Sequence, residues 1–454
     1  MKSVNIVSPC GMLGYGFPKE SFNQAFLKDI DGIVVDAGST DAGPHKLGAG
    51  VSIVSKRAVK KDLEIMLEAG IPKKIPIIIG SAGGAGAKPH VEQTLAILYE
   101  ILGERSYKAK IAIIWADFSQ EFVIDAMESN KTEPLSVNIP PLTEEAIRQT
   151  SSIVAQMGHE PIVEALKQNA DIIVCGRAYD PSPFAAIGIY HGMDEGLSYH
   201  LGKILECGAL CAEPGTTKDS ILGTLYEDGF TVESLNSKRV CTTTSVAAHT
   251  FYEKEHPYLL HGPGFTLNLV DCTFTEIAPG IVKVQNSKFE PATAHKIKLE
   301  GAKQTAYRTF VIAGVRDPLM IERIEEIEAE IRKEVSNYYA EISHDDYQIN
   351  VYHYGKDAVL GKNEPEVFHG HEIGVLFEVL AVTQELSNSI CANLRSTYLH
   401  YGYDGRKSTA GNLAFPFAPS DIEFGPVYAF SIYHLMEVDD NPFQIEFREV
   451  GVHE

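Results

Sequence analysis

Short apolar runs alternate with segments of helical periodicity through the first two hundred residues of the chain. The apolar runs carry hydrophobic side chains on both faces, which is typical of buried parallel strands. They lie at residues 4–7, 32–35, 75–79, 110–115 and 171–175. Between them, residues 55–70 place apolar side chains at helical spacing and end in a glycine. Strands that alternate with helices predict right-handed βαβ crossovers and a doubly wound, mainly parallel sheet.

The pattern changes after about residue 216. Residues 218–300 carry β-branched and aromatic runs with Asp-Gly and Pro-Gly turns, which predicts an antiparallel sheet. From about residue 304 the order strand, helix, strand, strand, helix predicts a ferredoxin-like α+β layer. We therefore predict an α/β protein whose domains span residues 1–215 (doubly wound α/β), 216–300 (β-rich insertion) and 301–454 (α+β).

Loops rich in glycine and polar residues follow the predicted parallel strands. They span residues 8–18, 36–50, 80–90, 116–122 and 176–184. In an open α/β sheet ligands bind at the carboxyl edge, because loop amides and helix N-termini converge there. We predict the functional site at this edge. Four of these loops, residues 8–18, 36–50, 80–90 and 176–184, should line one pocket.

The second loop, DAGSTDAGPHKLGAG (36–50), is rich in side chains that can ionise or form hydrogen bonds. Proton transfer near neutral pH needs a histidine, or a carboxylate of raised pKa, beside a substrate held by cationic groups. Asp36, Asp41 and His45 are therefore candidate catalytic residues, and Ser39 and Lys46 are candidate substrate-binding residues. Each of them taken singly is also explained by a capped helix or a solvated loop.

Two further loops offer groups that could bind an anion. In GSAGGAGAKPH, Gly83 and Gly84 have unhindered amides and Lys88 lies nearby, so this loop predicts either an anion site or a close-packed turn. It matches neither of the common nucleotide-binding motifs. Arg177, just past a predicted strand, could form a bidentate pair with a carboxylate, either that of Asp180 or that of a ligand. Asp180 also fits a helix N-cap.

Composition and charge limit the possible functions. The 454 residues exceed what one core usually supports, and no apolar stretch is long enough to span a bilayer. The N-terminus lacks the features of a secretory signal, so we expect a cytoplasmic protein. A net charge of −22 argues against a nucleic-acid groove, whereas binding of an anionic small molecule depends only on the local field.

Metal and disulfide chemistry receive little support from the sequence. The seven cysteines are scattered without a CxxC pair, which indicates neither a disulfide framework nor a zinc knuckle. The HGH tripeptide at 369–371 and the pair Asp36 and Asp41 are possible ligands of a divalent metal, but no spacing pattern supports them. We expect no cofactor to be required, with a divalent metal as the alternative.

Several motifs carry a resemblance to a known family. The runs GRAYDPSPF and HLGKILECGALC resemble the signature of the acyclic terpene utilisation family, in which GR-x-x-D-x-S precedes a helix ending in LECGA. The loops VVDAGSTDAGP and GSAGGAG, and the segments YRTFVIAGVRDP and GNLAFPFAPSD, are similar to a branch of that family. The resemblance implies an enzyme of small-acid or acyl-CoA catabolism. Its motif residues here are Asp36, Ser39, Asp41, Lys46, Gly83, Gly84, Arg177, Asp180, Arg316 and Asp317. We include Arg316 among the candidate substrate-binding residues.

We predict cofactor-independent acid/base chemistry, a hydration, dehydration or isomerisation next to a carboxylate or thioester. Arg177 and Lys46 would hold the carboxylate, and the amides of residues 80–88 would stabilise an enolate-like oxygen. His45 or Asp36 would move the proton. The expected partner is a small carboxylate or an acyl-CoA, with no nucleic acid and no membrane, and the chain is expected to form a homo-oligomer.

Two alternatives stay open at this point. One is hydrolysis of an amide or thioester with Ser39 or Cys175 as nucleophile, although no GxSxG elbow is present. The other is a non-catalytic ligand-binding or assembly subunit that uses the same edge as a receptor.

Overall fold

The computed structural model describes residues 2–38, 43–252, 256–367, 370–407 and 410–451. By their internal contacts they form two compact units. The first unit is Met1–Lys303 with Phe430–Glu454, and the second is Gln304–Ala429. The predicted limits at residues 215 and 300 remain predictions.

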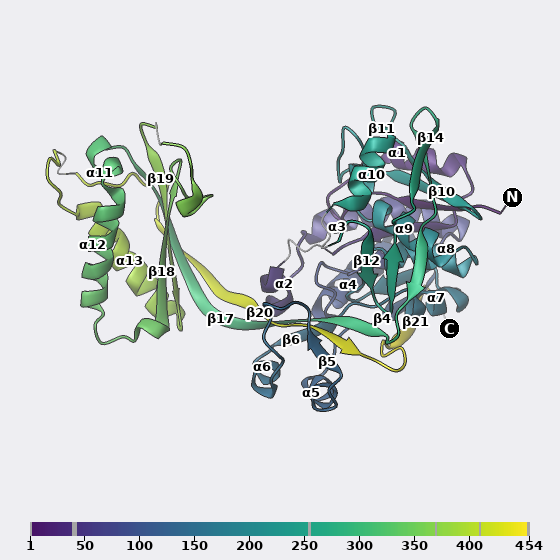
Figure 1. The fold of residues 1–454 in the computed structure, drawn as a ribbon, viewed down its shortest axis with the longest axis horizontal. Coiled ribbons are helices and arrows are strands. Elements are labelled where there is room, and N and C mark those ends of the chain that lie inside the picture. The colour runs from purple at the N-terminus through teal and green to yellow at the C-terminus, as the bar shows by residue number, and fades with distance from the viewer. Residues whose placement is uncertain (1, 39–42, 253–255, 368–369, 408–409, 452–454) are drawn as a thin grey trace. The chain divides into compact units, whose positions relative to one another are not determined.

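A parallel sheet forms the centre of the first unit (Figure 1). Its strands, in spatial order, are β1 (Val4–Ser8), β2 (Gly32–Asp36), β3 (Ile77–Gly80), β7 (Ile172–Cys175) and β4 (Ala109–Ile114). Each neighbouring pair among them is parallel. These strands are the predicted apolar runs, and they are buried because Ile and Val cover both of their faces. The prediction of a mainly parallel α/β sheet is confirmed.

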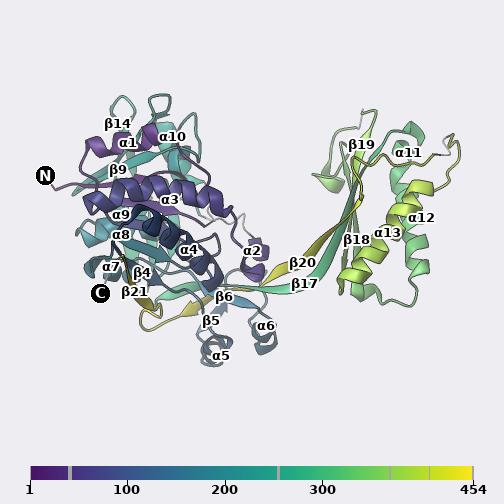
Figure 2. The ribbon, with the colours of Figure 1, turned by 180° about the vertical axis from the view of Figure 1, so that it is seen from behind.

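Helices cover both faces of this sheet (Figure 2). On one face, α3 (Lys56–Gly70) and α4 (Lys88–Arg105) pack against Val35 and Ala37. On the other face, α7 (Glu160–Lys167), α8 (Ser182–Tyr190) and α9 (Glu195–Leu205) pack against a core that includes Val34. Because side chains alternate along a strand, Asp36 belongs to the α8–α9 face and Ala37 to the α3–α4 face.

Antiparallel strands predicted for residues 218–300 are present, and four of them extend the parallel sheet beyond β1. These are β9 (Ile221–Tyr226), β10 (Gly229–Ser234), β15 (Ile281–Gln285) and β14 (Thr273–Ala278). A separate sheet contains β12 (Leu259–Gly262), β13 (Phe265–Asn268) and β16 (Lys288–Pro291). At the opposite edge, β21 (Ile445–Val450) pairs antiparallel with β4.

Shorter elements complete the first unit. Its remaining helices are α1 (Lys19–Gln24), α2 (Gly43–Ala49), α5 (Gln120–Glu128), α6 (Glu144–Arg148) and α10 (Thr243–Phe251). Its remaining strands are β5 (Thr132–Pro134), β6 (Ser152–Ala155), β8 (Ala212–Glu213) and β11 (Val240–Cys241). None of the helices in the described parts of the chain combines the length and the apolarity needed to cross a membrane.

The second unit has the predicted ferredoxin-like topology. Two strands belong to both units: β17 (Lys296–Val315) begins in the first unit and β20 (Asp421–Glu437) ends in it. Along the chain the elements of the second unit are the later part of β17, α11 (Pro318–Glu322), α12 (Ile324–Tyr338), β18 (Tyr347–Tyr354), β19 (Ile373–Ala381), α13 (Gln384–His400) and the first part of β20. The sheet order β18-β19-β17-β20 places the first strand beside the third and the fourth, as a split βαβ layer requires. Its core joins one face of β17 and β19 to α12 and α13.

Candidate active site

Asp36 and Arg177 lie at the same edge of the parallel sheet, as predicted. Asp36 ends β2, Arg177 follows β7 by two residues, and β3 lies between these strands. The Asp36 carboxylate accepts a hydrogen bond from the amide of Gly38 (3.0 Å). A methyl group added to Gly38 would lie 3.2 Å from Nη1 of Arg177, so the two predicted loops meet closely here.

Internal partners engage the Arg177 guanidinium. Nε donates to Glu300 Oε2 (2.9 Å), and Nη2 makes a longer contact with Glu300 Oε1 (3.4 Å). Nη1 donates to Asp180 Oδ1 (3.0 Å) and to the hydroxyl of Ser81 (3.1 Å). Arg177 is buried, and these bonds join its own loop to the third loop and to β17. Asp180 pairs with Arg177 through one nitrogen only, and the bidentate partner is Glu300, which the sequence did not indicate. Binding of a ligand's carboxylate to Arg177 stays a prediction.

Glu300, on β17, is the second partner of Arg177. Burial alone would raise the pKa of Glu300, but the charges of Arg177 and Lys298 outweigh burial and lower that pKa to about 2. Lys298 lies 3.0 Å from this carboxylate, and the side-chain amide of Gln156 donates to it (3.1 Å). Glu300 therefore stays ionised and fixes the positive charge of Arg177 in place.

A buried ion pair at the end of α9 adds a second cation. Lys203 Nζ lies 2.5 Å from Glu206 Oε1, and the residues are only 2% and 6% exposed. Burial lowers the pKa of Lys203, but Glu206 and, more weakly, Asp180 outweigh burial, and the net pKa is raised. The lysine thus keeps its proton in a site from which most water is excluded. Its ammonium also lies 4.9 Å from the centre of the Tyr252 ring.

The charges of Asp180, Glu206 and Arg177 all act on the pKa of the Asp36 carboxyl. Burial is the largest cause that raises the pKa of Asp36 well above its ordinary value, and the charges of Asp180 and Glu206 act in the same direction. The hydrogen bond from Gly38 and the charge of Arg177 oppose this rise without cancelling it. Asp36 therefore holds a proton far more readily than an exposed aspartate, beside a fixed guanidinium.

The other candidates of the second loop lie in or next to α2. His45 and Lys46 are half-buried residues of this helix. The carbonyl of Lys46 accepts a hydrogen bond from Nε2 of the buried His90 (3.1 Å). Ser39 and Asp41 fall outside the described residues. The predicted roles of all four stay predictions.

The glycine-rich third loop is closely packed. The amide of Gly84 donates to the carbonyl of Ser81 (3.0 Å), and that of Gly86 donates to Ala82 (3.1 Å). Gly83 lines a cavity described below. The exposed Lys88 places its ammonium 5.9 Å from the centre of the Trp115 ring. The backbone bonds favour the close-packed-turn interpretation at Gly84 and Gly86, while an anion role for Gly83 and Lys88 stays a prediction.

Arg316 belongs to the second unit. It is exposed and precedes Asp317, which caps the N-terminus of α11 by accepting from the amides of Leu319 (2.8 Å) and Met320 (3.1 Å). Its proposed contact with substrate stays a prediction.

Metal-ligating residues do not cluster in the described part of the chain, where no group of three or more His, Cys, Asp or Glu is arranged to hold an ion. His369 of the HGH tripeptide and Asp41 fall outside that part. Cys175, an alternative nucleophile, is completely buried, and burial and the charge of Asp36 raise the pKa of its thiol. A thiol so protected from ionisation is a poor nucleophile.

Sequence reasoning missed three charged residues of this site: Lys203, Glu206 and Glu300. Lys203 and Glu206 stand within the motif HLGKILECGALC, where their i,i+3 spacing on a helix was a usable signal. Glu300 had no local signal, because it reaches Arg177 from a strand 123 residues away along the chain.

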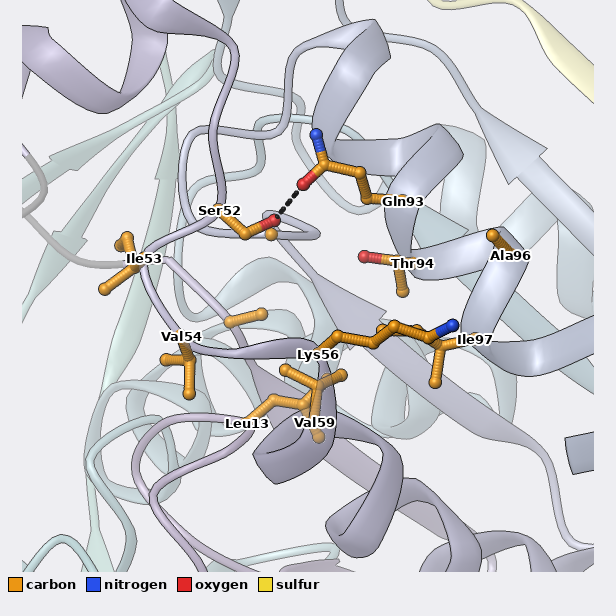
Figure 3. Close-up of a pocket in the computed structure, with 12 residues that line it drawn as sticks. Leu13, Ser52, Ile53, Val54, Lys56, Val59, Gln93, Thr94, Ala96 and Ile97 are labelled. Carbon is orange, nitrogen blue, oxygen red and sulfur yellow. Dashed lines mark hydrogen bonds between the residues drawn. The ribbon is translucent and has the colours of Figure 1, made fainter. Parts of the chain in front are cut away.

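Three of the four loops predicted to line one pocket do contribute to a single cavity of about 340 Å³ (Figure 3). The first loop supplies Leu13, the second Ala37 and the third Gly83. The cavity lies on the α3–α4 face of the sheet. The loop that carries Arg177 contributes no residue to the described lining of this cavity. Asp36 and Arg177 direct their side chains to the opposite, α8–α9 face of the sheet.

The chain was compared with known protein families, with curated proteins and with solved structures. A family model described as acyclic terpene utilisation family protein AtuA matches residues 55–408. No curated protein and no solved structure matches the chain. The matched region covers well over half of the chain and includes the loop of Arg177 and Asp180 together with the Lys203–Glu206 pair. The chain belongs to the acyclic terpene utilisation family.

Proposed function

We propose that this protein is an enzyme that performs acid/base chemistry on a small carboxylate or acyl-CoA, a hydration, dehydration or isomerisation in which Asp36 moves the proton. One observation carries the proposal. Asp36 is a buried carboxyl with a raised pKa, and it lies beside Arg177 and within electrostatic reach of the Lys203–Glu206 pair. This is the environment that tunes carboxylates for proton transfer near neutral pH.

Each charged group has a distinct part in the proposed reaction. Removal of a proton next to a carbonyl leaves negative charge on the carbonyl oxygen, and nearby cations stabilise that charge most strongly where water is excluded. Lys203 and Arg177 are the candidate cations for this role, and their carboxylate partners hold them in place. Asp36 would take the proton and return it at a neighbouring position or to a leaving hydroxide. The charges of Asp180 and Glu206 make Asp36 a stronger base than an ordinary aspartate.

The buried Cys175 thiol, whose pKa burial raises, weakens the hydrolase alternative with Cys175 as nucleophile. Hydrolysis with Ser39 as nucleophile stays open. A purely ligand-binding subunit would leave the protons of a bound ligand unexchanged.

Hydrogen–deuterium exchange on candidate substrates tests the proposal. The purified full-length protein is incubated in D₂O with branched and straight acyl-CoA thioesters and short carboxylates, and mass spectrometry follows the deuterium content of each. We expect at least one compound to exchange the proton next to its carbonyl. Asp36→Asn should slow this exchange by about 10²–10⁴-fold, because that is the usual contribution of a proton-transfer group.

Asp125→Asn, on the exposed side of α5, is the matched control and should exchange at the wild-type rate. Wild-type exchange in a folded Asp36→Asn protein would show that another group moves the proton. Binding of a compound in the panel without exchange or turnover would favour the ligand-binding alternative.

A further inference from the structure

A cavity lies between α3 and α4 (Figure 3), and Asp36 is not among the residues that line it. Its volume of about 340 Å³ is in the range of small-molecule sites. The interior is formed by side chains that are nearly inaccessible to solvent, namely Leu13, Ala37, Val59, Thr94 and Ile97. Lys56, Gln93 and Ala96 are exposed and form the rim. We call this space the α3–α4 cavity.

The polar side chains that line the α3–α4 cavity are bonded to protein groups. Ser52 donates to Gln93 Oε1 (2.8 Å), the contact drawn in Figure 3, and Gln93 Nε2 donates to the carbonyl of Gly50 (3.0 Å). Thr94 donates to the carbonyl of His90, one turn earlier in its own helix (3.0 Å). The hydroxyl hydrogens of Ser52 and Thr94 are therefore already used, so a ligand acceptor could take them only by displacing these bonds, whereas an apolar ligand gains free energy by leaving water.

Lys56 makes the rim amphipathic. Its ammonium pairs with Glu100 (2.7 Å), and Figure 3 shows its aliphatic stem extending toward Ile97. The ammonium stays largely exposed, with the side chain 65% accessible. A ligand whose chain filled the interior would therefore place its polar end among polar groups at the rim.

The walls of the α3–α4 cavity are fixed before any ligand binds. Asp62 of α3 accepts hydrogen bonds from the amides of Gly14 (2.7 Å) and Gly16 (3.0 Å), which holds the first loop against this helix. The amide of Ile53 donates to the carbonyl of Gly83 (3.2 Å) and so ties the segment after α2 to the third loop. A preformed apolar site does not spend binding free energy on ordering itself.

We propose that the α3–α4 cavity binds the aliphatic chain of an amphipathic ligand, with the polar end of that ligand at the Lys56 rim. Two sources share this chemistry. The aliphatic chain is part of the substrate, or it belongs to a separate lipid-like molecule. The cavity adjoins the site proposed above through the backbone, since the amide of Leu13 donates to the carbonyl of Asp36 (2.9 Å). Binding of the aliphatic chain does not depend on the proposed reaction.

Calorimetric titration with butanoate, hexanoate, octanoate and decanoate, kept below micelle-forming concentrations, tests this inference. We expect the affinity of the wild-type protein to rise by about fourfold for each added methylene until the cavity is full, as burial of hydrocarbon predicts. Ala96→Trp places an indole at the rim and should abolish this dependence on chain length. Glu92→Trp, one turn earlier at an exposed position of α4, should retain it.

The source of the chain is distinguished by deuterium exchange on thioesters of increasing length. If the chain belongs to the substrate, Ala96→Trp shifts exchange toward shorter thioesters. If it belongs to a separate molecule, Ala96→Trp loses carboxylate binding but keeps the exchange profile. An affinity that does not rise with chain length in the wild-type protein overturns the inference, and so does a rise that persists unchanged in Ala96→Trp. Calorimetry needs no turnover, so failure here is separable from failure of the proposed reaction.

Discussion

At the scale of single residues, the site contains buried charged groups, most of which form ion pairs with one another. Arg177 is matched by Glu300 and Asp180, and Lys203 is matched by Glu206. Buried ion pairs contribute little net stability, but losing one partner is costly because the other charge is left without compensation. Within the described part of the chain Asp36 forms no ion pair, although the charge of Arg177 acts on it, and its neighbours include two further carboxylates. Burial is the largest cause that raises the pKa of Asp36, and these two negative charges raise it further.

The raised pKa of Asp36 predicts a pH dependence of stability. The folded state keeps the Asp36 proton to a higher pH than the unfolded chain, whose aspartates titrate near pH 3.9. Between these two pKa values the folded state binds more protons, so stability falls as pH rises, by at most about 1.4 kcal/mol per pH unit. Asp36→Asn removes this contribution. The variant should therefore gain stability relative to the wild type as pH rises from about 4.

Urea unfolding of the wild type and of Asp36→Asn across this pH range measures the difference between their free energies of unfolding. The contributions of titrating groups that do not interact with Asp36 cancel in this difference. Two free-energy curves that run parallel with pH would mean that the pKa of Asp36 is the same in the folded and unfolded states.

At the scale of elements, the loops after β3 and β7 are held against each other by backbone groups. The amide of Ala82 donates to the carbonyl of Cys175 (3.0 Å), at the end of β7. Gly86 has a φ of +65°, and a methyl group added to it would lie 2.2 Å from the backbone nitrogen of Arg177. The third loop thus approaches the chain at Arg177 as closely as a residue without a Cβ allows. This contact fixes the position from which Arg177 projects its side chain.

Gly86→Ala should therefore be strongly destabilising. The left-handed conformation and the overlap with the Arg177 backbone together should cost about 2–5 kcal/mol of unfolding free energy. Gly103→Ala is the matched control, because Gly103 is an exposed residue of α4 with open space around its Cα. That change should be neutral or stabilising by up to about 1 kcal/mol, as the helix propensity of alanine predicts. Urea denaturation compares the two variants. Equal stabilities would refute the close packing described for Gly86.

At the scale of the whole molecule, the sheet of the second unit has one face without a helix. The helices α12 and α13 pack against the face that carries Val311. The opposite face carries Ile312 (41% exposed) and Phe424 (46% exposed), and the Arg308 guanidinium lies 4.9 Å from the Phe424 ring. Apolar side chains that lie together on an exposed sheet face are typical of protein interaction surfaces. The homo-oligomer predicted from the sequence stays a prediction, and this face is its candidate interface.

Sedimentation velocity at micromolar concentration tests this prediction. The wild-type protein should sediment as an oligomer. Ile312→Asp should weaken association on the order of tenfold or more, because it would bury an unpaired carboxylate in the interface. Val359→Asp, at a position that is 84% exposed in the same unit, should associate as the wild type does. A monomeric wild-type protein, or equal association in all three proteins, would exclude this face as the interface.

The sequence by itself determined the types and the order of the main elements and the family. The buried parallel strands, the ferredoxin-like order after residue 304 and the position of Asp36 at a strand end could all be predicted. Hydrophobic periodicity is a local property, and it specifies both the type of an element and the face that it buries. The family motifs are local in the same sense, since each is contiguous in the chain.

Only the tertiary structure decided which side chains meet. Arg177 was predicted to bind a ligand's carboxylate or Asp180, yet Glu300 of β17 reaches it across 123 positions of sequence. Likewise, the antiparallel strands expected in a separate insertion include four that join the parallel sheet beside β1. The partner of an edge side chain depends on which strands and loops become neighbours in space. That arrangement is set by contacts between segments far apart in the chain, and no local pattern encodes them.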